Sequence, residues 1–255
     1  MKIRILGSAP SNPALRQFVS SYLINDRVAI DAGCLGFYGT AEDQAAANHL
    51  FLTHSHADHC ASLPIFLENC YGLGPQCPVI YGSAHTLDSL QRHLFNDVVW
   101  PDFIKLSAYT RPFLRLQVLE AEKPLEAEQL CITPVAVNHV VPTFAYLVSD
   151  GQATVVFAAD SGPTDRLWEI TRQLPSLRGV FLEASFPNSM QGLAEVSLHL
   201  TPEMFAAEVA KMPPSTRVIA VHIKTRYRET VVRELSGLGL PTLEIGECET
   251  TILFD

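Results

Sequence analysis

The sequence predicts a layered α/β protein whose sheets mix parallel and antiparallel strands. Short apolar runs rich in β-branched residues recur along the chain with turn residues between them, which is typical of strands. Stretches with the apolar spacing of helices are interspersed among these runs, which favours a layered arrangement. Asp150-Gly151 lies between two apolar runs and predicts a tight hairpin, because glycine accepts the positive φ of such a turn.

The expected elements follow these runs in chain order. Strands are expected at residues 2–7, 22–25, 27–31, 50–53, 78–82, 114–120, 131–139, 144–150, 153–160, 179–185, 217–223, 242–246 and 251–255. Helices are expected at residues 41–48, 59–71, 84–99, 164–174, 202–212 and 227–238, the fifth with Thr201 as N-cap and Pro202 at its first position. Because no repeat, low-complexity tract or linker divides the sequence, we expect a single domain over residues 1–255.

The composition excludes some classes of function. The chain has 255 residues, is 47% hydrophobic and carries a formal net charge of -9, which argues against binding nucleic acid or anionic lipid through its overall field. The opening MKIRILGSAP lacks the apolar stretch of a secretory signal, and nowhere do about eighteen apolar residues run together, so we expect a soluble cytoplasmic protein. The 6 cysteines are scattered without CxxC spacing, which favours buried thiols over disulfides or a thiolate zinc site.

The stretch LFLTHSHADHC, residues 50–60, crowds potential metal ligands behind an apolar run. It contains His54, His56, Asp58 and His59. Imidazole nitrogens and carboxylate oxygens both bind zinc and related divalent ions, and such a cluster is costly to bury without a cation. A polar surface loop is the alternative interpretation.

Further polar residues follow apolar runs later in the chain, at His139, Asp160 and His222. Each lies where an expected buried strand emerges at the edge of a sheet. Any one of them also fits an ordinary turn or cap residue. Three such residues together with the first cluster favour a metal site.

This pattern resembles the HxHxDH...H...D...H signature of the metallo-β-lactamase-fold hydrolases. The resemblance covers essentially the whole chain and implies an αββα sandwich, with two mixed β-sheets face to face and helices outside. It also implies a dinuclear metal site at one sheet edge. The implied ligands are His54, His56 and His139 for one ion, Asp58, His59 and His222 for the other, and Asp160 bridging both.

Other segments are similar to class II cyclic-nucleotide phosphodiesterases. They are LQRHLFNDVVWPDF (residues 90–103), FLEASFPNSM (181–190), HLTPE (199–203) and VHIK (221–224). In the first segment His93 and Asn96 are candidates for lining a substrate pocket, whereas an amphipathic helix with aromatic core anchors explains Phe95, Trp100 and Phe103 without any such role. Ser62 stands where these hydrolases usually carry glycine, and the opening loop GSAPSNP is poorer in glycine than theirs.

The resemblance implies hydrolysis of 3',5'-cyclic nucleotides to nucleoside 5'-monophosphates by a hydroxide shared between two metal ions. The implied substrate is cAMP, with cGMP as a further candidate. His199 is implied as proton donor or oxyanion stabiliser, and Asp58 as handling the proton of the nucleophile. Asp31 is a candidate acceptor for a ligating imidazole, or else a turn residue, and Glu183 is a candidate support of the site or else an ordinary strand-end carboxylate. Zinc is the expected metal, and the nitrogen and oxygen ligands also suit manganese or iron.

Three alternatives stay open at this point. HIKTRY (residues 222–227), EASF and HLTP also resemble transfer-RNA 3'-end nucleases, but the interval from His139 to Asp160 has room only for a hairpin and not for the RNA-clamping arm of those enzymes. An esterase or lactonase of the same fold, or a non-catalytic metal-binding module, has the same ligands. The expected partner is a small-molecule substrate without nucleic acid or membrane, and the oligomeric state, including a homodimer, is left open.

Overall fold

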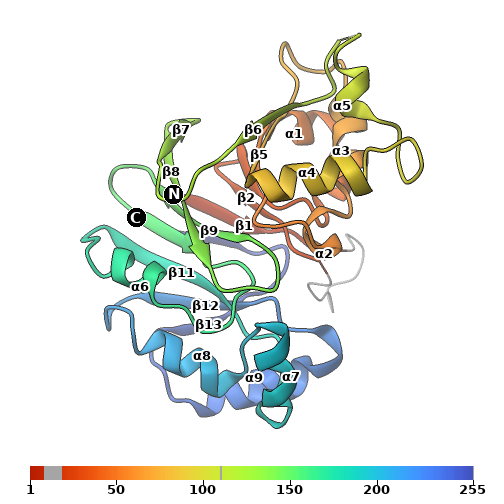
Figure 1. Cartoon of the computed structure of the whole chain (residues 1–255). Helices are drawn as coiled ribbons and strands as arrows, with labels where there is room; N and C mark the ends of the chain where they lie inside the picture. Colours follow the sequence, from red (N-terminus) through yellow and green to blue (C-terminus); the bar gives the residue numbers. More distant parts are fainter. Residues whose placement is uncertain (9–18, 110, 255) are drawn as a thin grey trace. The chain divides into compact units, whose positions relative to one another are not determined.

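The computed structural model describes residues 1–8, 19–109 and 111–254 (Figure 1). Most of the glycine-poor opening loop, from residue 9 onward, lies outside the described residues. Contacts group the chain into two units. The first, here the N-terminal unit, contains Lys2–Glu120 and Cys248–Ile252, and the second, here the C-terminal unit, contains Met1, Ala121–Glu247 and the end of the chain from Leu253.

The N-terminal unit is built on a seven-stranded mixed sheet with the order β14-β1-β2-β3-β4-β5-β6 (Figure 1). Its strands are β1 (Lys2–Ile5), β2 (Tyr22–Ile24), β3 (Val28–Ile30), β4 (His49–Phe51), β5 (Val79–Gly82), β6 (Arg115–Val118) and β14 (Thr251–Leu253). β1, β2 and β3 pair antiparallel, whereas β3, β4, β5 and β6 pair parallel. The carboxyl ends of β3 and β4 therefore lie side by side at one edge of the sheet.

Short helices cover this sheet. They are α1 (Ala41–Ala46), α2 (Ala57–Cys60), α3 (Leu63–Cys70), α4 (Ala84–His93) and α5 (Phe103–Leu106), with a 3-10 turn η1 (Leu35–Phe37). Thr40 and Asp43 form a capping box at the start of α1, which satisfies two backbone donors that the helix itself cannot pair. In the core of the unit, Leu50 and Ile80 from the strands pack with Phe66 of α3, and all three side chains are fully buried.

One helix expected over residues 59–71 is two helices, α2 and α3, separated at Ser62. The Ser62 hydroxyl donates to the Ala32 carbonyl at 2.7 Å and accepts the Gly36 N–H at 2.9 Å. This fully buried side chain therefore joins the break between the helices to the loop that follows β3. Serine at position 62, where the related hydrolases usually carry glycine, thus has a structural role, because its hydroxyl holds these two segments together.

The helix expected over residues 84–99 is wrong beyond His93, where α4 ends. Asp97 adopts a left-handed φ of 61°, and the Asn96 side chain accepts the N–H groups of Val98 and Val99 at 3.0 and 2.9 Å. A side chain that pairs with nearby backbone in this way competes with the helical hydrogen-bond pattern and ends the helix. Phe95 remains a buried core residue, as the amphipathic interpretation expected.

The C-terminal unit is built on a second seven-stranded mixed sheet, with the order β13-β12-β11-β10-β9-β8-β7 (Figure 1). Its strands are β7 (Leu125–Ala127), β8 (Leu130–Val137), β9 (Thr143–Ser149), β10 (Thr154–Phe157), β11 (Leu177–Glu183), β12 (Arg217–Val221) and β13 (Leu243–Ile245). The Asp150-Gly151 hairpin is confirmed, because β9 and β10 pair antiparallel and Gly151 has a φ of 89°. β7 was not predicted, because three residues with a central glutamate carry no apolar pattern.

Helices α6 (Arg166–Thr171), α7 (Gln191–Ser197), α8 (Pro202–Val209) and α9 (Arg228–Gly237) belong to this unit, with 3-10 turns η2 (Asn188–Met190) and η3 (Thr225–Tyr227). Thr201 caps α8 through its hydroxyl, ahead of Pro202 at the first turn, as expected. Helix α7 was not predicted, because its apolar residues Leu193 and Val196 are exposed and mark no buried face. The core joins strand residues such as Val180 and Val218 to Trp168, Phe205 and Leu235 of the helices.

A buried carboxylate ties the two helices α6 and α8 together. Glu208 of α8 accepts the indole N–H of Trp168 at 2.6 Å and the backbone N–H of Thr164 at 3.1 Å. Its second oxygen accepts from the Lys211 ammonium at 2.8 Å. Trp168 and Glu208 are both buried, so water does not replace these bonds if the carboxylate is lost.

All six cysteines lie in the described residues, and each is a free thiol. Cys34, Cys60 and Cys70 are buried, and burial raises the pKa of each thiol to about 12. The other three are partly buried. Among the described residues, no helix combines the length and apolar character that a membrane crossing requires.

We expect Glu208→Ala to lower the free energy of unfolding by about 2–4 kcal/mol, because it leaves the Trp168 indole and the Thr164 N–H without an acceptor. Urea denaturation followed by tryptophan fluorescence and circular dichroism measures this change. The control is Glu203→Ala on the exposed side of the same helix, which we expect to change stability by less than about 1 kcal/mol. Equal stabilities of the two variants would contradict the role given to Glu208.

Candidate metal centre

Strand direction gathers the predicted ligands of the C-terminal unit at one edge of its sheet. β8 and β10 both pair antiparallel with β9, so they run in the same direction, and β10, β11 and β12 pair parallel. The carboxyl ends of these four strands therefore emerge at the same edge. His139 follows β8, Asp160 follows β10, Glu183 ends β11 and His222 follows β12.

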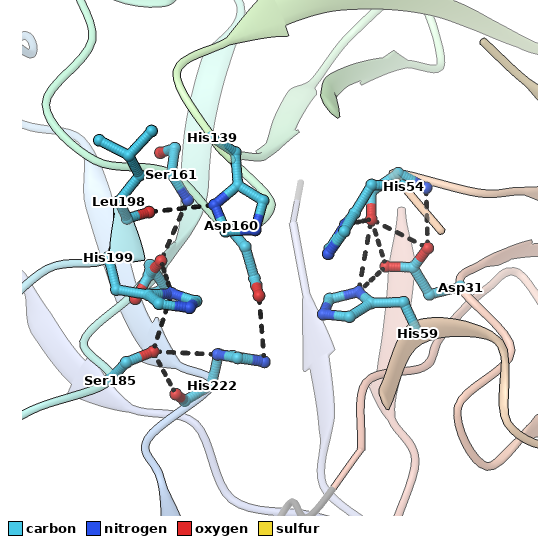
Figure 2. Close-up of polar contacts among 12 residues, drawn as sticks. Asp31, His54, His59, His139, Asp160, Ser161, Ser185, Leu198, His199 and His222 are labelled. Carbon is cyan, nitrogen blue, oxygen red and sulfur yellow. Dashed lines mark hydrogen bonds and ion pairs between the residues drawn. The ribbon is translucent and has the colours of Figure 1, made fainter. Parts of the chain in front are cut away.

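Figure 2 shows the side chains of His139, Asp160 and His222 close together within the unit. One potential ligand atom from each of His139, Asp160 and His199 lies within 4.8 Å of the other two, and the same holds for Glu183, His199 and His222. His222 Nε2 lies 3.4 Å from Asp160 Oδ2. Asp160, Glu183, His199 and His222 are all buried. Water therefore has little access to these two carboxylates and two imidazoles.

His199 forms a buried pair with Glu183. Its Nδ1 donates to Glu183 Oε1 at 2.6 Å, and that carboxylate also accepts the N–H groups of Ser161 at 3.0 Å and Leu200 at 3.3 Å. Burial of the ring lowers the pKa of His199, but the charge of Glu183 and the hydrogen bond to it outweigh burial and leave the pKa above its ordinary value. His199 is therefore held ready to carry a proton.

The Nδ1 atoms of the other two histidines in this unit also have defined partners. His139 Nδ1 lies 3.1 Å from the Leu198 carbonyl, which can only accept, so the ring donates. His222 Nδ1 lies 3.0 Å from the Ser185 hydroxyl. A neutral imidazole that donates from Nδ1 carries its lone pair on Nε2, the nitrogen available for a metal.

The N-terminal unit gathers a second group after β3 and β4 (Figure 2). Asp31 Oδ2 accepts from His59 Nδ1 at 2.7 Å. The Thr53 hydroxyl lies 3.0 Å from His54 Nδ1. The ring centroids of His54 and His56 are 4.5 Å apart. Burial raises the pKa of the Asp31 carboxyl, while the charge of His59 and the donors around the carboxyl oppose the rise.

Gly33 lets the ligand-bearing loop approach the backbone after β3. The Ala32 N–H donates to the His59 carbonyl at 2.8 Å, and the Ser20 N–H donates to the Asp58 carbonyl at 2.8 Å. A Cβ at Gly33 would lie 2.2 Å from the Asp58 carbonyl oxygen and 2.7 Å from the backbone of Ser20. Only glycine fits this contact, which holds Asp58 and His59 in place.

Four residues in or beside these groups have left-handed backbone conformations although none is glycine. They are Asp31 (φ 61°), Ala159 (φ 58°), Leu198 (φ 53°) and His222 (φ 53°). Such conformations cost of order 1–3 kcal/mol each in non-glycine residues and concentrate at functional sites. Here they direct the Asp160 side chain, the Leu198 carbonyl and the His222 ring toward their partners.

The two predicted pocket residues lie in and after α4. His93 is exposed in the last turn of the helix, and the Asn96 side chain is used in the turn that follows. Their contact with a substrate stays a prediction. No function was expected for His49 or His85. His49 lies on β4, and His85 lies at an exposed position of α4.

The donor set in each unit suits a divalent cation. It consists of imidazole nitrogens and carboxylate oxygens, without thiolates, which is the chemistry of zinc, manganese and iron sites. Histidines that bind metals usually donate their second ring N–H to an acceptor that fixes the orientation of the ring, and the Nδ1 hydrogen bonds described above are of this kind. The residues present therefore fit a metal, and the full ligand set of His54, His56, Asp58, His59, His139, Asp160 and His222 stays a prediction.

Three residues that support these groups were not predicted from the sequence. Thr53 directly precedes His54, and a hydroxyl beside a strand-end ligand was the available signal. Ser185 and Leu198 gave no such signal, because their contacts with His222 and His139 join distant parts of the chain. Glu183 was left with two interpretations, and the structure shows it buried against His199.

We expect Gly33→Ala to lower the free energy of unfolding by about 3 kcal/mol or more, because the added Cβ overlaps backbone atoms that have little room to move. Thermal and urea unfolding measure the loss. Gly192→Ala is the control, since a Cβ there meets nothing within 4 Å, and we expect it to keep or slightly raise stability. A Gly33→Ala variant as stable as the control would show that the loop is not held by this contact.

The raised pKa of His199 gives a stability contribution with a defined pH dependence. It is fully present below the ordinary histidine pKa of 6.5 and is lost as the pH rises through the higher folded-state pKa. In metal-free protein, we therefore expect Glu183→Gln to destabilise more at pH 6 than at pH 9 and to lower the pKa of His199 measured by NMR. An unchanged His199 pKa in this variant would contradict the pairing.

Comparison with known proteins places the chain in a family. Residues 27–223 match the Beta-lactamase superfamily domain. The chain is 28% identical over 213 residues to a probable 3',5'-cyclic-nucleotide phosphodiesterase of Yersinia pestis, covering 71% of this chain and 58% of that protein. It is 35% identical over 231 residues to 3',5'-cyclic-nucleotide phosphodiesterase 1 of Saccharomyces cerevisiae, covering 74% and 61%. The chain thus spans about three fifths of the length of these two curated relatives.

Other similarities extend over nearly the whole chain. It is 22% identical over 296 residues to ribonuclease Z of Phocaeicola vulgatus, covering 95% of this chain and 94% of that enzyme. Its structure resembles that of unliganded yeast PDE1 with a TM-score of 0.80 and 19% identity, covering 99% of both chains. The expected fold class, two mixed sheets flanked by helices, is confirmed by the two sheets and by this neighbour. The chain belongs to the β-lactamase superfamily and has the metallo-β-lactamase fold.

Proposed function

We propose that residues 1–255 are one hydrolase domain with a two-metal site, and that the chain hydrolyses 3',5'-cyclic nucleotides to nucleoside 5'-monophosphates. The observation that carries the proposal is the group formed by Asp160, His199, His222 and Glu183, which combines metal-binding chemistry with a buried proton donor. The two phosphodiesterase relatives support a cyclic nucleotide as the substrate class.

The proposed site takes two divalent cations. Zinc is the first choice, with manganese and iron as alternatives, because the ligands are nitrogen and oxygen atoms. When bound, a pair of divalent cations lowers the pKa of water toward neutrality and offsets the negative charge of a phosphoryl group. The residues that would hold the pair are His54, His56, Asp58, His59, His139, Asp160 and His222.

The remaining chemistry falls to the chain's own side chains. His199 carries the proton that the departing ribose 3'-oxygen needs, and Glu183 holds its ring through Nδ1, so that Nε2 faces the reacting group. Asp58 accepts the proton of the attacking water. Asp31 keeps His59 oriented through the bond at 2.7 Å.

A specific observation favours a small substrate over RNA. The interval between His139 and Asp160 contains β9, the turn at Asp150-Gly151 and β10, and this hairpin fills it. The RNA-clamping arm implied by the nuclease resemblance has no place there. The net charge of -9 also disfavours binding a long polyanion.

A ribonuclease Z-like activity is the second candidate. The similarity to ribonuclease Z of Phocaeicola vulgatus covers 95% of the chain, more than either phosphodiesterase match, and this coverage favours it. The two candidates use the same metal chemistry and differ only in what is presented to it. A direct comparison of substrates therefore separates them.

We expect metal-free protein reloaded with zinc, manganese or iron to hydrolyse cAMP or cGMP, and to lose this activity when a chelator is added. Product analysis by chromatography measures hydrolysis, with bis(p-nitrophenyl) phosphate as generic diester and a precursor transfer RNA as nuclease substrate. Trimming of the transfer RNA without hydrolysis of either cyclic nucleotide would assign the nuclease activity instead.

Two variants separate metal binding from proton transfer. We expect Asp160→Asn to lower both bound metal and kcat/KM for the cyclic nucleotide, the latter by more than about a hundredfold. His199→Asn keeps the metal content and lowers kcat by about 10²–10⁴-fold, because it removes only the proton donor. Elemental analysis and steady-state kinetics measure both effects, with exposed His85→Gln as the control. Loss of metal from His199→Asn would make His199 a ligand.

A further inference from the structure

Each unit places one buried hydroxyl against Nδ1 of a predicted metal ligand. Thr53 in the N-terminal unit lies 3.0 Å from His54 Nδ1, and Ser185 in the C-terminal unit lies 3.0 Å from His222 Nδ1. We propose that Thr53 and Ser185 are positioning residues that hold His54 and His222 in the Nδ1-protonated tautomer, so that each ring presents the lone pair of Nε2 to a divalent cation. The inference rests on the metal site of the proposed function.

The proton of the Thr53 hydroxyl is committed to Asp31. The hydroxyl oxygen lies 2.9 Å from Asp31 Oδ2 and 3.1 Å from Oδ1, and the Thr53 N–H donates to Oδ1 at 2.8 Å. With the His59 ring also donating to Oδ2, the carboxylate collects its donors from Thr53 and His59. A hydroxyl has only one proton, so toward His54 it can only accept. His54 must then donate from Nδ1.

The same count applies to Ser185. Its hydroxyl lies 3.1 Å from the His222 backbone carbonyl, which can only accept, so the hydroxyl proton goes there. The His222 ring, 3.0 Å away, must then donate from Nδ1 to the hydroxyl oxygen. The left-handed φ of 53° at His222 lets its carbonyl and its ring both reach Ser185. His222 Nε2 is thereby the nitrogen that faces Asp160, at 3.4 Å.

Two other predicted ligands have the same orientation through different acceptors. His59 Nδ1 donates to the Asp31 carboxylate, and His139 Nδ1 donates to the Leu198 carbonyl. All four rings therefore have Nδ1 in contact with an acceptor. A carboxylate or a carbonyl can only accept, so it fixes the tautomer of an imidazole by itself. A hydroxyl can also donate, so it fixes the tautomer only if its own proton is donated to another acceptor. Asp31 is that acceptor for the Thr53 hydroxyl, and the His222 carbonyl is that acceptor for the Ser185 hydroxyl.

Burial makes the two hydroxyls hard to replace. Thr53 is 1% exposed and Ser185 is 0% exposed, so water has little access to Nδ1 if either hydroxyl is removed. The tautomer with the proton on Nε2 then gains population, and that form has no lone pair to offer at Nε2. Metal binding must then shift the tautomer first, which weakens it.

The direct test reads the tautomers in metal-free protein. Long-range ¹H–¹⁵N spectra of histidine-labelled protein at pH 8 distinguish protonated Nδ1 from protonated Nε2, with resonances assigned by single His→Gln variants. We expect Nδ1 protonation at His54 and His222 in the wild type, in Thr53→Ser and in the control Thr86→Val, whose buried hydroxyl pairs with that of Ser83. Thr53→Val shifts His54, and Ser185→Ala shifts His222, toward Nε2 protonation.

The second test titrates metal-free protein with zinc against a competing chelator. We expect Thr53→Val and Ser185→Ala each to weaken zinc binding by about 10–100-fold, and Thr53→Ser to stay within about threefold of the wild type. Circular dichroism and thermal unfolding check that each variant folds. Nε2 protonation of His54 or His222 in the wild type would overturn the proposal even if a variant failed to fold, as would unchanged tautomers and zinc affinity in both variants.

The outcome is separable from that of the proposed function. Spectra and zinc titration involve no substrate, so they stand whether or not cyclic nucleotides are hydrolysed. If the wild type binds zinc with the expected tautomers but leaves cyclic nucleotides intact, the substrate assignment fails and the role of the hydroxyls holds. If the wild type hydrolyses cyclic nucleotides with Nε2-protonated His54, the function holds and the inference fails.

Discussion

A buried carboxylate that accepts an imidazole Nδ1–H at a strand end is the interaction on which each unit's site depends. Asp31 holds His59 at 2.7 Å in the N-terminal unit, and Glu183 holds His199 at 2.6 Å in the C-terminal unit. A buried carboxylate is costly unless donors surround it, and both have backbone N–H groups as additional donors. The same bonds that stabilise the carboxylates also fix the orientation of the rings.

Strand direction gathers the site residues of each unit at one edge of its own sheet. In the C-terminal unit, the ends of β8, β10, β11 and β12 bring residues from positions 139 to 222 to one sheet edge. In the N-terminal unit, β3 and β4 do the same for Asp31 and Thr53. A strand in a packed sheet is rigid, so a ligand placed just beyond its end needs only a short, well-anchored connection to be held in place.

Those connections are where the chain departs from relaxed geometry. Ala159, Leu198 and His222 adopt left-handed conformations, and Gly33 allows a backbone contact that any side chain would prevent. The left-handed residues direct the Asp160 side chain, the Leu198 carbonyl and the His222 ring toward their partners. The unfavourable local conformations persist because buried strands and helices on both sides determine the path of the chain.

The sequence by itself determined the strands, the family signature and the residue types at the strand ends, because these depend on local apolar patterns and on short motifs. It also identified the hairpin at Asp150-Gly151 and the cap at Thr201. The end of α4, where the Asn96 side chain competes with the helix, was predicted wrongly, and α7 was not predicted, because its larger apolar residues Leu193 and Val196 are exposed. Only the tertiary structure decided that Ser185 contacts His222, that Leu198 contacts His139 and that Glu183 contacts His199. Hydrogen bonds of this kind join residues from separate strands and helices, so they are set by the packing of those elements and leave no pattern in the local sequence.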